Sequence, residues 1–158
     1  MSADLYQQRM LQLAAGADSA GRLEAPAVTV TLDNPLCGDR VRIDLRCSAE
    51  GRIEALSHEV RGCVLCRAAA ALLGAHAAGH DARALHAVRT GLHAGLRGEG
   101  PWPEADAWPE LEVFQPVAAH KSRHECVLLP FDAMLAALEQ CADPADAHGR
   151  PAASSTGT

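Results

Sequence analysis

The sequence is poor in aromatic residues and in positive charge. Only 3% of its 158 residues are aromatic, and 14 lysines and arginines stand against 20 aspartates and glutamates, a formal net charge of -6. The two tryptophans, Trp102 and Trp108, fall in a proline-rich segment rather than among basic residues. Nucleic-acid binding proteins need clustered basic residues for the phosphates and exposed aromatic rings for the bases. We therefore expect no nucleic-acid partner.

Long apolar runs are missing as well. No stretch approaches the ~20 apolar residues that a membrane-spanning helix requires. Asp4, Gln7 and Arg9 stand where a secretory signal would place its apolar segment. We expect a cytoplasmic protein with no membrane partner. Since disulfides are rare in the cytoplasm, the six cysteines are expected to be reduced thiols, with Cys47 filling the core and Cys141 exposed at a helix end.

The composition suits a single globular domain. Hydrophobic residues make up 48% of the chain and charged residues 22%, which is enough to build one core at this length. We place this domain at residues 1–141. Residues 142–158 are rich in alanine, proline, serine, glycine and threonine, a composition typical of a flexible tail.

Two segments in the first half of the chain alternate between apolar and polar residues, as half-buried strands do. They cover 28–33 and 40–48, and the turn between them contains Pro35 and Gly38. A third strand is expected at 52–61, after the turn at Glu50 and Gly51. Helical patterns follow the strands instead of alternating with them, which favours an antiparallel sheet. The predicted fold class is α+β, a small antiparallel three-stranded sheet packed against helices.

The predicted helices combine helical spacing of apolar residues with high helix propensity. Gly16 ends the first helix, Asp81 is the expected N-cap of another, and Pro130 interrupts the last one. The five helical segments are 4–15, 63–73, 82–95, 110–118 and 122–140.

Three cysteines stand at the edges of predicted elements. Cys37 lies in the proline and glycine turn, Cys63 at a strand-to-helix junction, and Cys126 beside charged residues. Asp39, two residues after Cys37, can turn its carboxylate toward the same point. Three thiolates and one carboxylate form a candidate tetrahedral site for Zn²⁺, and iron–sulfur clusters accept the same thiolates. Such a site stays negative after Zn²⁺ binds, so it needs a nearby cation, for which Arg123 is well placed.

The candidate ligands fall in three short motifs. These are Asn-Pro-Leu-Cys-Gly-Asp at 34–39, Gly-Cys at 62–63 and Arg-His-Glu-Cys at 123–126. With these motifs the chain resembles the NifU N-terminal/IscU-like family of iron–sulfur scaffolds over roughly 5–140, and the SufU branch most closely. SufU-type members share the insertion between the second and third cysteines and the arginine three residues before the last one. They also lack the Leu-Pro-Pro-Val-Lys chaperone-binding segment of IscU.

The resemblance implies a zinc-binding sulfur acceptor that is not itself an enzyme. Its partner would be a pyridoxal-phosphate cysteine desulfurase of the SufS type, and downstream iron–sulfur assembly proteins would receive the sulfur. The family's metal ligands match, position by position, Cys37, Asp39, Cys63 and Cys126. In SufU-like proteins the thiol that corresponds to Cys37 leaves the metal and accepts persulfide sulfur, and Arg123 would serve as counter-ion.

Three other functions stay open at this point. The same thiols could hold an iron–sulfur cluster on a scaffold of the IscU type. Cys63 and Cys66 form a Cys-x-x-Cys pair that would suit a dithiol oxidoreductase, although no thioredoxin-like pattern surrounds it. A structural zinc domain that only binds a partner is the third alternative. Cys66 is either a packing residue or a neighbour of the site, and His124 is either a substitute ligand or a cap residue.

Overall fold

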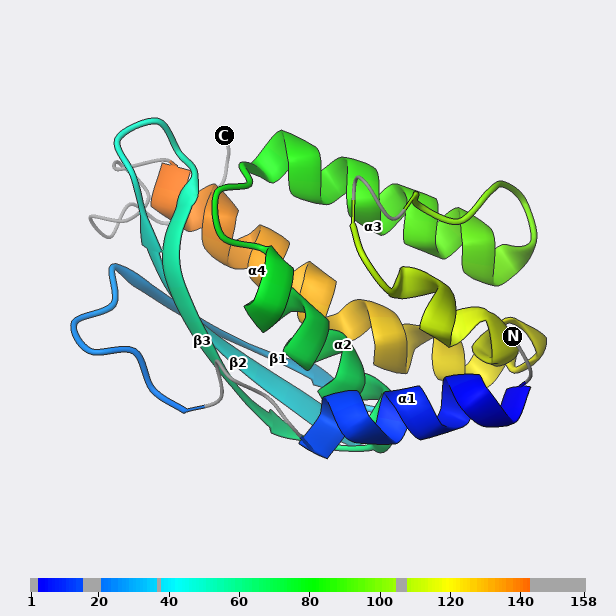
Figure 1. Cartoon of the computed structure of the whole chain (residues 1–158). Helices are drawn as coiled ribbons and strands as arrows, with labels where there is room; N and C mark the ends of the chain where they lie inside the picture. The colour runs from blue at the N-terminus through cyan, green and yellow to red at the C-terminus, as the bar shows by residue number, and fades with distance from the viewer. Residues whose placement is uncertain (1–2, 16–20, 37, 105–107, 143–158) are drawn as a thin grey trace.

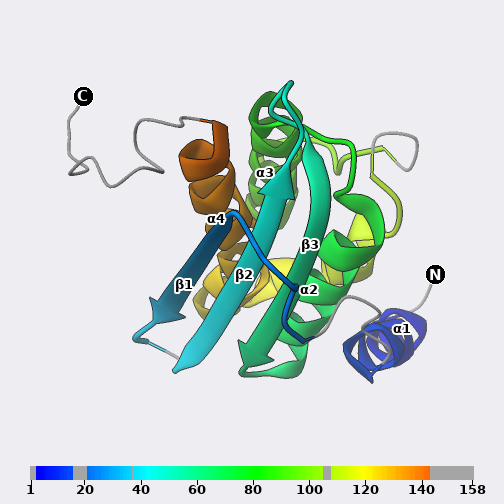
Figure 2. The ribbon, with the colours of Figure 1, turned by 90° about the vertical axis from the view of Figure 1, so that its left-hand side faces the viewer.

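A three-stranded antiparallel sheet forms one layer of the protein. The computed structural model describes residues 3–15, 21–36, 38–104 and 108–142. The strands are β1 (Val28–Asn34), β2 (Asp39–Cys47) and β3 (Ile53–Arg61), and β2 lies between the other two. Figure 2 shows the sheet in front and most of the helices behind it. The α+β fold and the three-stranded antiparallel sheet predicted from the sequence are confirmed.

The helices cover one face of the sheet (Figure 1). Helix α4 (His124–Ala142) packs on β1 and β2, while α1 (Ala3–Ala15) packs beside α2 (Val64–His76) and the 3-10 helix η1 (Leu111–Ala119). The other helices are α3 (Ala82–Arg97) and the short 3-10 helix η2 (Lys121–Arg123). None of the described helices is both long and apolar enough to cross a bilayer.

Two helix predictions differ from the structure in kind. Segment 110–118 was expected to be an ordinary helix, but η1 is a 3-10 helix that contains Pro116. A proline inside a helix removes one backbone donor and clashes with the preceding turn, which disfavours regular α-helical hydrogen bonding here. The opposite happens in α4, which continues through Pro130 without interruption because its buried face packs on the sheet. The predicted tail, residues 142–158, lies outside the described residues from 143 onward.

The central strand supplies the middle of the core. Val41, Ile43 and Leu45 alternate along β2, are fully buried, and belong to one cluster with Phe131 and Leu138 of α4. Alternation places these side chains on the helix-covered face of the sheet. Burial of that apolar stripe fixes the register of β2, since a slip by one residue would turn its charged side chains into the core.

Asp44 is a buried carboxylate on the opposite face of β2. Its side chain is fully shielded from solvent, and it accepts hydrogen bonds from the Leu23 N–H (3.0 Å), the Arg22 Nε (3.1 Å) and the Thr29 hydroxyl (2.8 Å). Burial alone would raise the pKa of Asp44, but these bonds and the charge of Arg42 together hold it below its ordinary value. Asp44 thus anchors the segment that leads into β1.

We expect Asp44→Asn to lower the free energy of unfolding by about 3 kcal/mol at pH 7, because it removes a buried charge that satisfies several donors. A carboxyl whose folded pKa is depressed stabilises the fold above its ordinary pKa of about 3.9 and loses that contribution as the pH falls further. The deficit of the variant should therefore shrink toward pH 3. Urea denaturation at both pH values measures it. Asp33→Asn is the control, since the Asp33 pair with Arg40 is exposed and solvent screens such a pair, so stability should barely change. A deficit that persists at pH 3 would contradict this assignment.

A disulfide joins Cys47, the last residue of β2, to Cys141 in the last turn of α4. The expectation that all six cysteines are reduced thiols is therefore wrong, whereas Cys47 packs against the core as expected. The two residues are 94 positions apart in the sequence, and only the parallel course of β2 and α4 brings them together (Figure 2). Of the described cysteines, Cys63, Cys66 and Cys126 lie outside any disulfide.

Candidate metal centre

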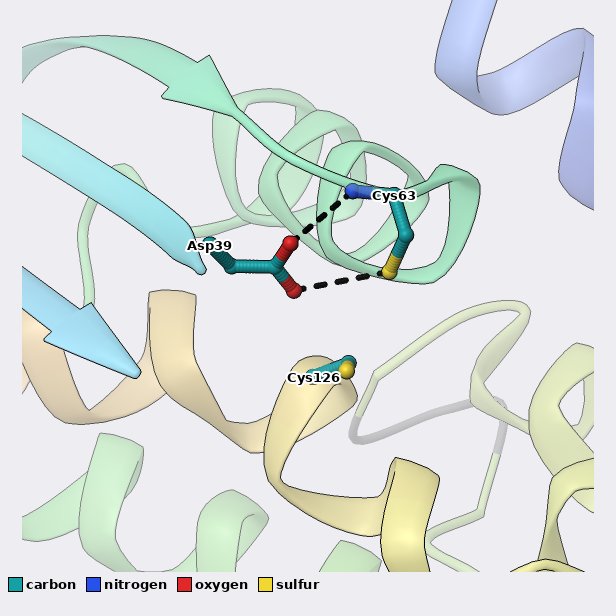
Figure 3. Close-up of side chains that lie close together, drawn as sticks. All are labelled: Asp39, Cys63 and Cys126. Carbon is teal, nitrogen blue, oxygen red and sulfur yellow. Dashed lines mark hydrogen bonds between the residues drawn. The ribbon is translucent and has the colours of Figure 1, made fainter. Parts of the chain in front are cut away.

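Three elements meet at one end of the sheet and bring three of the predicted ligands together. Asp39 is the first residue of β2, Cys63 is the N-cap of α2, and Cys126 lies in the first turn of α4. One ligand atom from each of them lies within 4.8 Å of the others. Figure 3 shows the Asp39 carboxylate and the Cys63 sulfur pointing toward each other above Cys126. Cys37, the fourth predicted ligand, lies outside the described residues.

Asp39 is held in place by Cys63. The Cys63 N–H donates to Oδ1 of Asp39 at 3.0 Å, and the Cys63 thiol lies 3.4 Å from Oδ2 (Figure 3). The Asp39 side chain approaches from β2 and is almost completely buried, with 2% of the residue exposed. Cys126 is also fully buried, whereas Cys63 is half-buried. The donor group therefore opens to solvent mainly on the Cys63 side.

Arg123 is a positively charged side chain beside the donor group. Arg123 lies immediately before α4. Hydrogen bonds to two thiols, mainly that of Cys63 and secondly that of Cys126, raise the pKa of its guanidinium above the ordinary value. An arginine is permanently charged and offers several donors in a fixed plane. Arg123, the predicted counter-ion, therefore lies beside both of these thiols.

The two residues with open roles do not join this donor group. Cys66 is fully buried in the hydrophobic core. His124 is buried too, and its Nε2 lies 3.1 Å from the Val117 carbonyl oxygen and 3.2 Å from that of Ala118. That nitrogen donates to the end of η1, so His124 ties η1 to α4. In the described part of the chain, the donor group contains neither residue.

An apolar groove borders the metal centre and was not anticipated from the sequence. It has a volume of about 620 Å³ and is lined by Leu11 of α1, Val64 of α2 and Arg123, among others. Leu11 and Val64 are 52% and 38% exposed, which is high for large hydrophobic side chains. Leu36, in the turn before Asp39, is 91% exposed. Two exposed apolar side chains, Leu11 and Val64, therefore line the groove beside the donor group.

The donor set suits zinc. Zn²⁺ prefers tetrahedral sites of thiolate, imidazole and carboxylate ligands, and catalytic or exchanging sites keep one position open. Two thiols and a carboxylate from three separate elements leave room for one further ligand. A cluster of iron and sulfide would also accept the thiolates.

Comparison with known proteins points to one family. The family model described as "NifU-like N terminal domain" matches residues 5–127. A solved structure of a nitrogen-fixing NifU-like protein (N-terminal) from Brucella abortus is 31% identical, with 89% of this chain and 97% of that chain covered and a TM-score of 0.81. No match was found among curated proteins.

A second solved structure supports the fold alone. It is a protein from Fervidobacterium islandicum AW-1, described as an iron–sulfur cluster assembly scaffold for the SUF system. The two chains are 18% identical, with 87% of this chain and 99% of that chain covered, and the TM-score is 0.76. The arrangement of sheet and helices is thus shared at low sequence identity.

Proposed function

We propose that this chain, which belongs to the NifU-like N-terminal domain family, is a zinc-binding acceptor of persulfide sulfur from a cysteine desulfurase. The family is one of scaffolds for iron–sulfur cluster assembly and is generally not catalytic, so the resemblance found in the sequence is confirmed at this level. The observation that carries the proposal is the convergence of Asp39, Cys63 and Cys126 within 4.8 Å.

Zn²⁺ would be held by Asp39, Cys63, Cys126 and, from the family resemblance, Cys37. Bound zinc would keep the thiols deprotonated and ordered. Arg123 offsets the excess negative charge, since its hydrogen bonds reach both described thiols. No imidazole is part of the donor group in the ranges that the structure describes.

Sulfur transfer then requires one thiolate to become available as a nucleophile. The Cys37 thiolate would attack the terminal sulfur of a persulfide on the desulfurase cysteine. A new S–S bond forms on Cys37, the S–S bond on the desulfurase breaks, and the desulfurase cysteine leaves as a thiolate, so no external oxidant or reductant is needed. We assign this role to Cys37 because it stands between β1 and β2 in the sequence, two residues before β2. Asp39 and Cys63, in contrast, stand at the start of β2 and α2.

The test compares two cysteine variants after incubation with a SufS-type desulfurase and cysteine. Wild type should bind about one zinc per chain and gain one sulfur atom by mass spectrometry. Cys37→Ala should not gain it. Cys66→Ala, which removes a buried thiol outside the donor group, should behave as wild type. Sulfur gain by Cys37→Ala together with its loss in Cys66→Ala would instead support the dithiol alternative.

A cluster-holding scaffold is the second candidate, because the donor thiols also suit iron. Anaerobic reconstitution with iron and sulfide distinguishes the two functions. A stable visible chromophore that displaces zinc would favour the scaffold, whereas retention of zinc would favour the sulfur acceptor.

The groove beside the metal centre is the surface on which the desulfurase would dock. Transfer requires the two sulfur atoms to touch, so the partner must cover the face on which the donor group opens. Leu11 lines this groove and Leu5 does not, although both lie on α1 and are 52% and 51% exposed.

We expect Leu11→Asp to weaken desulfurase binding by about tenfold or more, because it places a charge in an apolar contact. Leu5→Asp, the matched control, should change the Kd by no more than about twofold. Isothermal titration of each variant with the desulfurase measures the effect. Equal Kd values for the two variants would show that the partner docks elsewhere.

A further inference from the structure

Gly62 lies against the Asp39 carboxylate, where the chain leaves β3 and enters α2. A Cβ atom at position 62 would lie 2.3 Å from Oδ1 of Asp39, 2.7 Å from its Cγ and 3.0 Å from its Cβ. Non-bonded heavy atoms attract best near 3.5 to 4.0 Å, so any side chain at position 62 would force the carboxylate to move. The backbone of Gly62 is not in the left-handed region. Space, rather than backbone conformation, is therefore what requires glycine here.

The two oxygens of the Asp39 carboxylate have different partners. Oδ1 accepts the Cys63 N–H at 3.0 Å, and Oδ2 faces the Cys63 sulfur at 3.4 Å. Because Asp39 is only 2% exposed, a carboxylate displaced from this position would meet surrounding protein atoms. The position of Oδ2 relative to the thiols thus depends on Oδ1 remaining against Gly62.

The same carboxylate also completes the start of α2. Cys63 is the N-cap of α2, and its own side chain makes no capping hydrogen bond. In a capping box, the N–H of the N-cap residue is satisfied by a side chain three residues later. That later residue here is Cys66, and the acceptor comes instead from Asp39 on β2. Asp39, a residue of β2, therefore accepts the N–H that a glutamate or glutamine of the helix accepts in a capping box.

We propose that Gly62 is a positioning residue of the metal centre. The missing side chain at 62 creates the seat in which Asp39 holds the Cys63 N–H with one oxygen and directs the other toward the thiols. Its effect on metal binding rests on the proposed function, whereas its effect on the metal-free fold does not.

The first test is a Co²⁺ titration followed by visible and near-ultraviolet absorption, which reports tetrahedral sulfur ligation. Gly62→Ala should bind Co²⁺ about tenfold or more weakly than wild type, with altered d–d bands, as expected for residues that orient metal ligands. Gly100→Ala is the matched control, since a Cβ there meets nothing closer than 3.3 Å and the backbone is not in the left-handed region. Wild-type affinity and an unchanged spectrum in Gly62→Ala would overturn the proposal.

The second test is a double-mutant cycle on the metal-free protein. Gly62→Ala should lower the Tm by about 5 °C in the wild-type background, because overpacking typically costs 1–3 kcal/mol. In the Asp39→Ala background the same substitution should cost no more than about 2 °C, since the atoms it would strike are gone. If the single variant Gly62→Ala does not fold, Asp39→Ala can still be compared with Asp39→Ala/Gly62→Ala. That comparison gives the fall in Tm caused by Gly62→Ala when the Asp39 side chain is absent.

The outcomes separate this proposal from the proposed function. If Gly62→Ala lowered the Tm equally in both backgrounds, the proposal would be overturned, because the effect of Gly62 would not depend on Asp39. Failure of the wild-type protein to bind Co²⁺ would overturn the metal function, while the thermal cycle would still decide the role of Gly62.

Discussion

Cys63→Ser should lower the zinc affinity of the protein by about 100-fold or more. Structural zinc sites contribute roughly 10–16 kcal/mol in total, so the loss of one thiolate among four ligands is expected to cost on the order of 3 kcal/mol. Cys63 is half-buried and also donates its N–H to Asp39. Substitution of the sulfur leaves that backbone bond in place, which isolates the contribution of the thiolate.

Competition with a chromophoric zinc chelator measures this affinity. Cys66→Ala is the control on the same helix, since Cys66 is three residues further along α2 and lies outside the donor group. Its zinc affinity should stay within about twofold of wild type. If Cys63→Ser bound zinc as tightly as wild type, Cys63 would not be a ligand.

Reduction of the Cys47–Cys141 disulfide should lower the free energy of unfolding by about 4 to 5 kcal/mol. The bond closes a loop across a sequence separation of 94, and the loop-entropy argument gives this magnitude for a loop of that size. For a chain of this length such a loss corresponds to a fall in Tm of about 10 °C. Both cysteines are only partly buried, so a reductant can reach them.

Thermal unfolding with and without a phosphine reductant, at saturating zinc, measures the effect. The Cys47→Ser/Cys141→Ser variant should melt at the lower temperature in both conditions. A wild-type Tm that does not respond to the reductant would indicate that the two thiols do not form a bond in solution.

The donor group and the disulfide lie at opposite ends of the contact between β2 and α4. Asp39 begins β2 and Cys126 lies in the first turn of α4, while Cys47 ends β2 and Cys141 lies in the last turn of α4. Between the two ends, the apolar residues of β2 pack on α4. The donor group and the disulfide thus both connect β2 to α4, so loss of the proposed zinc and reduction of the disulfide should each loosen this packing.

Much of the sheet was predictable because strand alternation is a local pattern. Val41, Ile43 and Leu45 alternate with charged residues in the sequence, and the structure buries them as expected. Motif spacing and family resemblance place Asp39 and Cys63 in one candidate ligand set. The structure brings these two side chains together because both stand at element ends, where a short turn fixes the direction of the chain.

Other features depend on contacts that no local pattern reveals. The Cys47–Cys141 bond requires the parallel course of β2 and α4, and the seat at Gly62 requires the approach of Asp39 from a neighbouring strand. The role of His124 as a donor to the carbonyls of η1 likewise depends on how η1 packs against α4. For the contact of Asp39 with Gly62, the sequence offers one signal, the Gly-Cys dipeptide at 62–63. A glycine beside a candidate ligand suggests that another group approaches the backbone closely there.

Zinc-edge X-ray absorption on the purified protein tests the central claim most directly. Ligation by Cys37, Cys63, Cys126 and Asp39 predicts three sulfur neighbours at about 2.3 Å and one oxygen neighbour at about 2.0 Å. In Asp39→Ala the three sulfur neighbours should remain. A shell dominated by nitrogen and oxygen, or a wild-type protein that retains no zinc, would contradict the account.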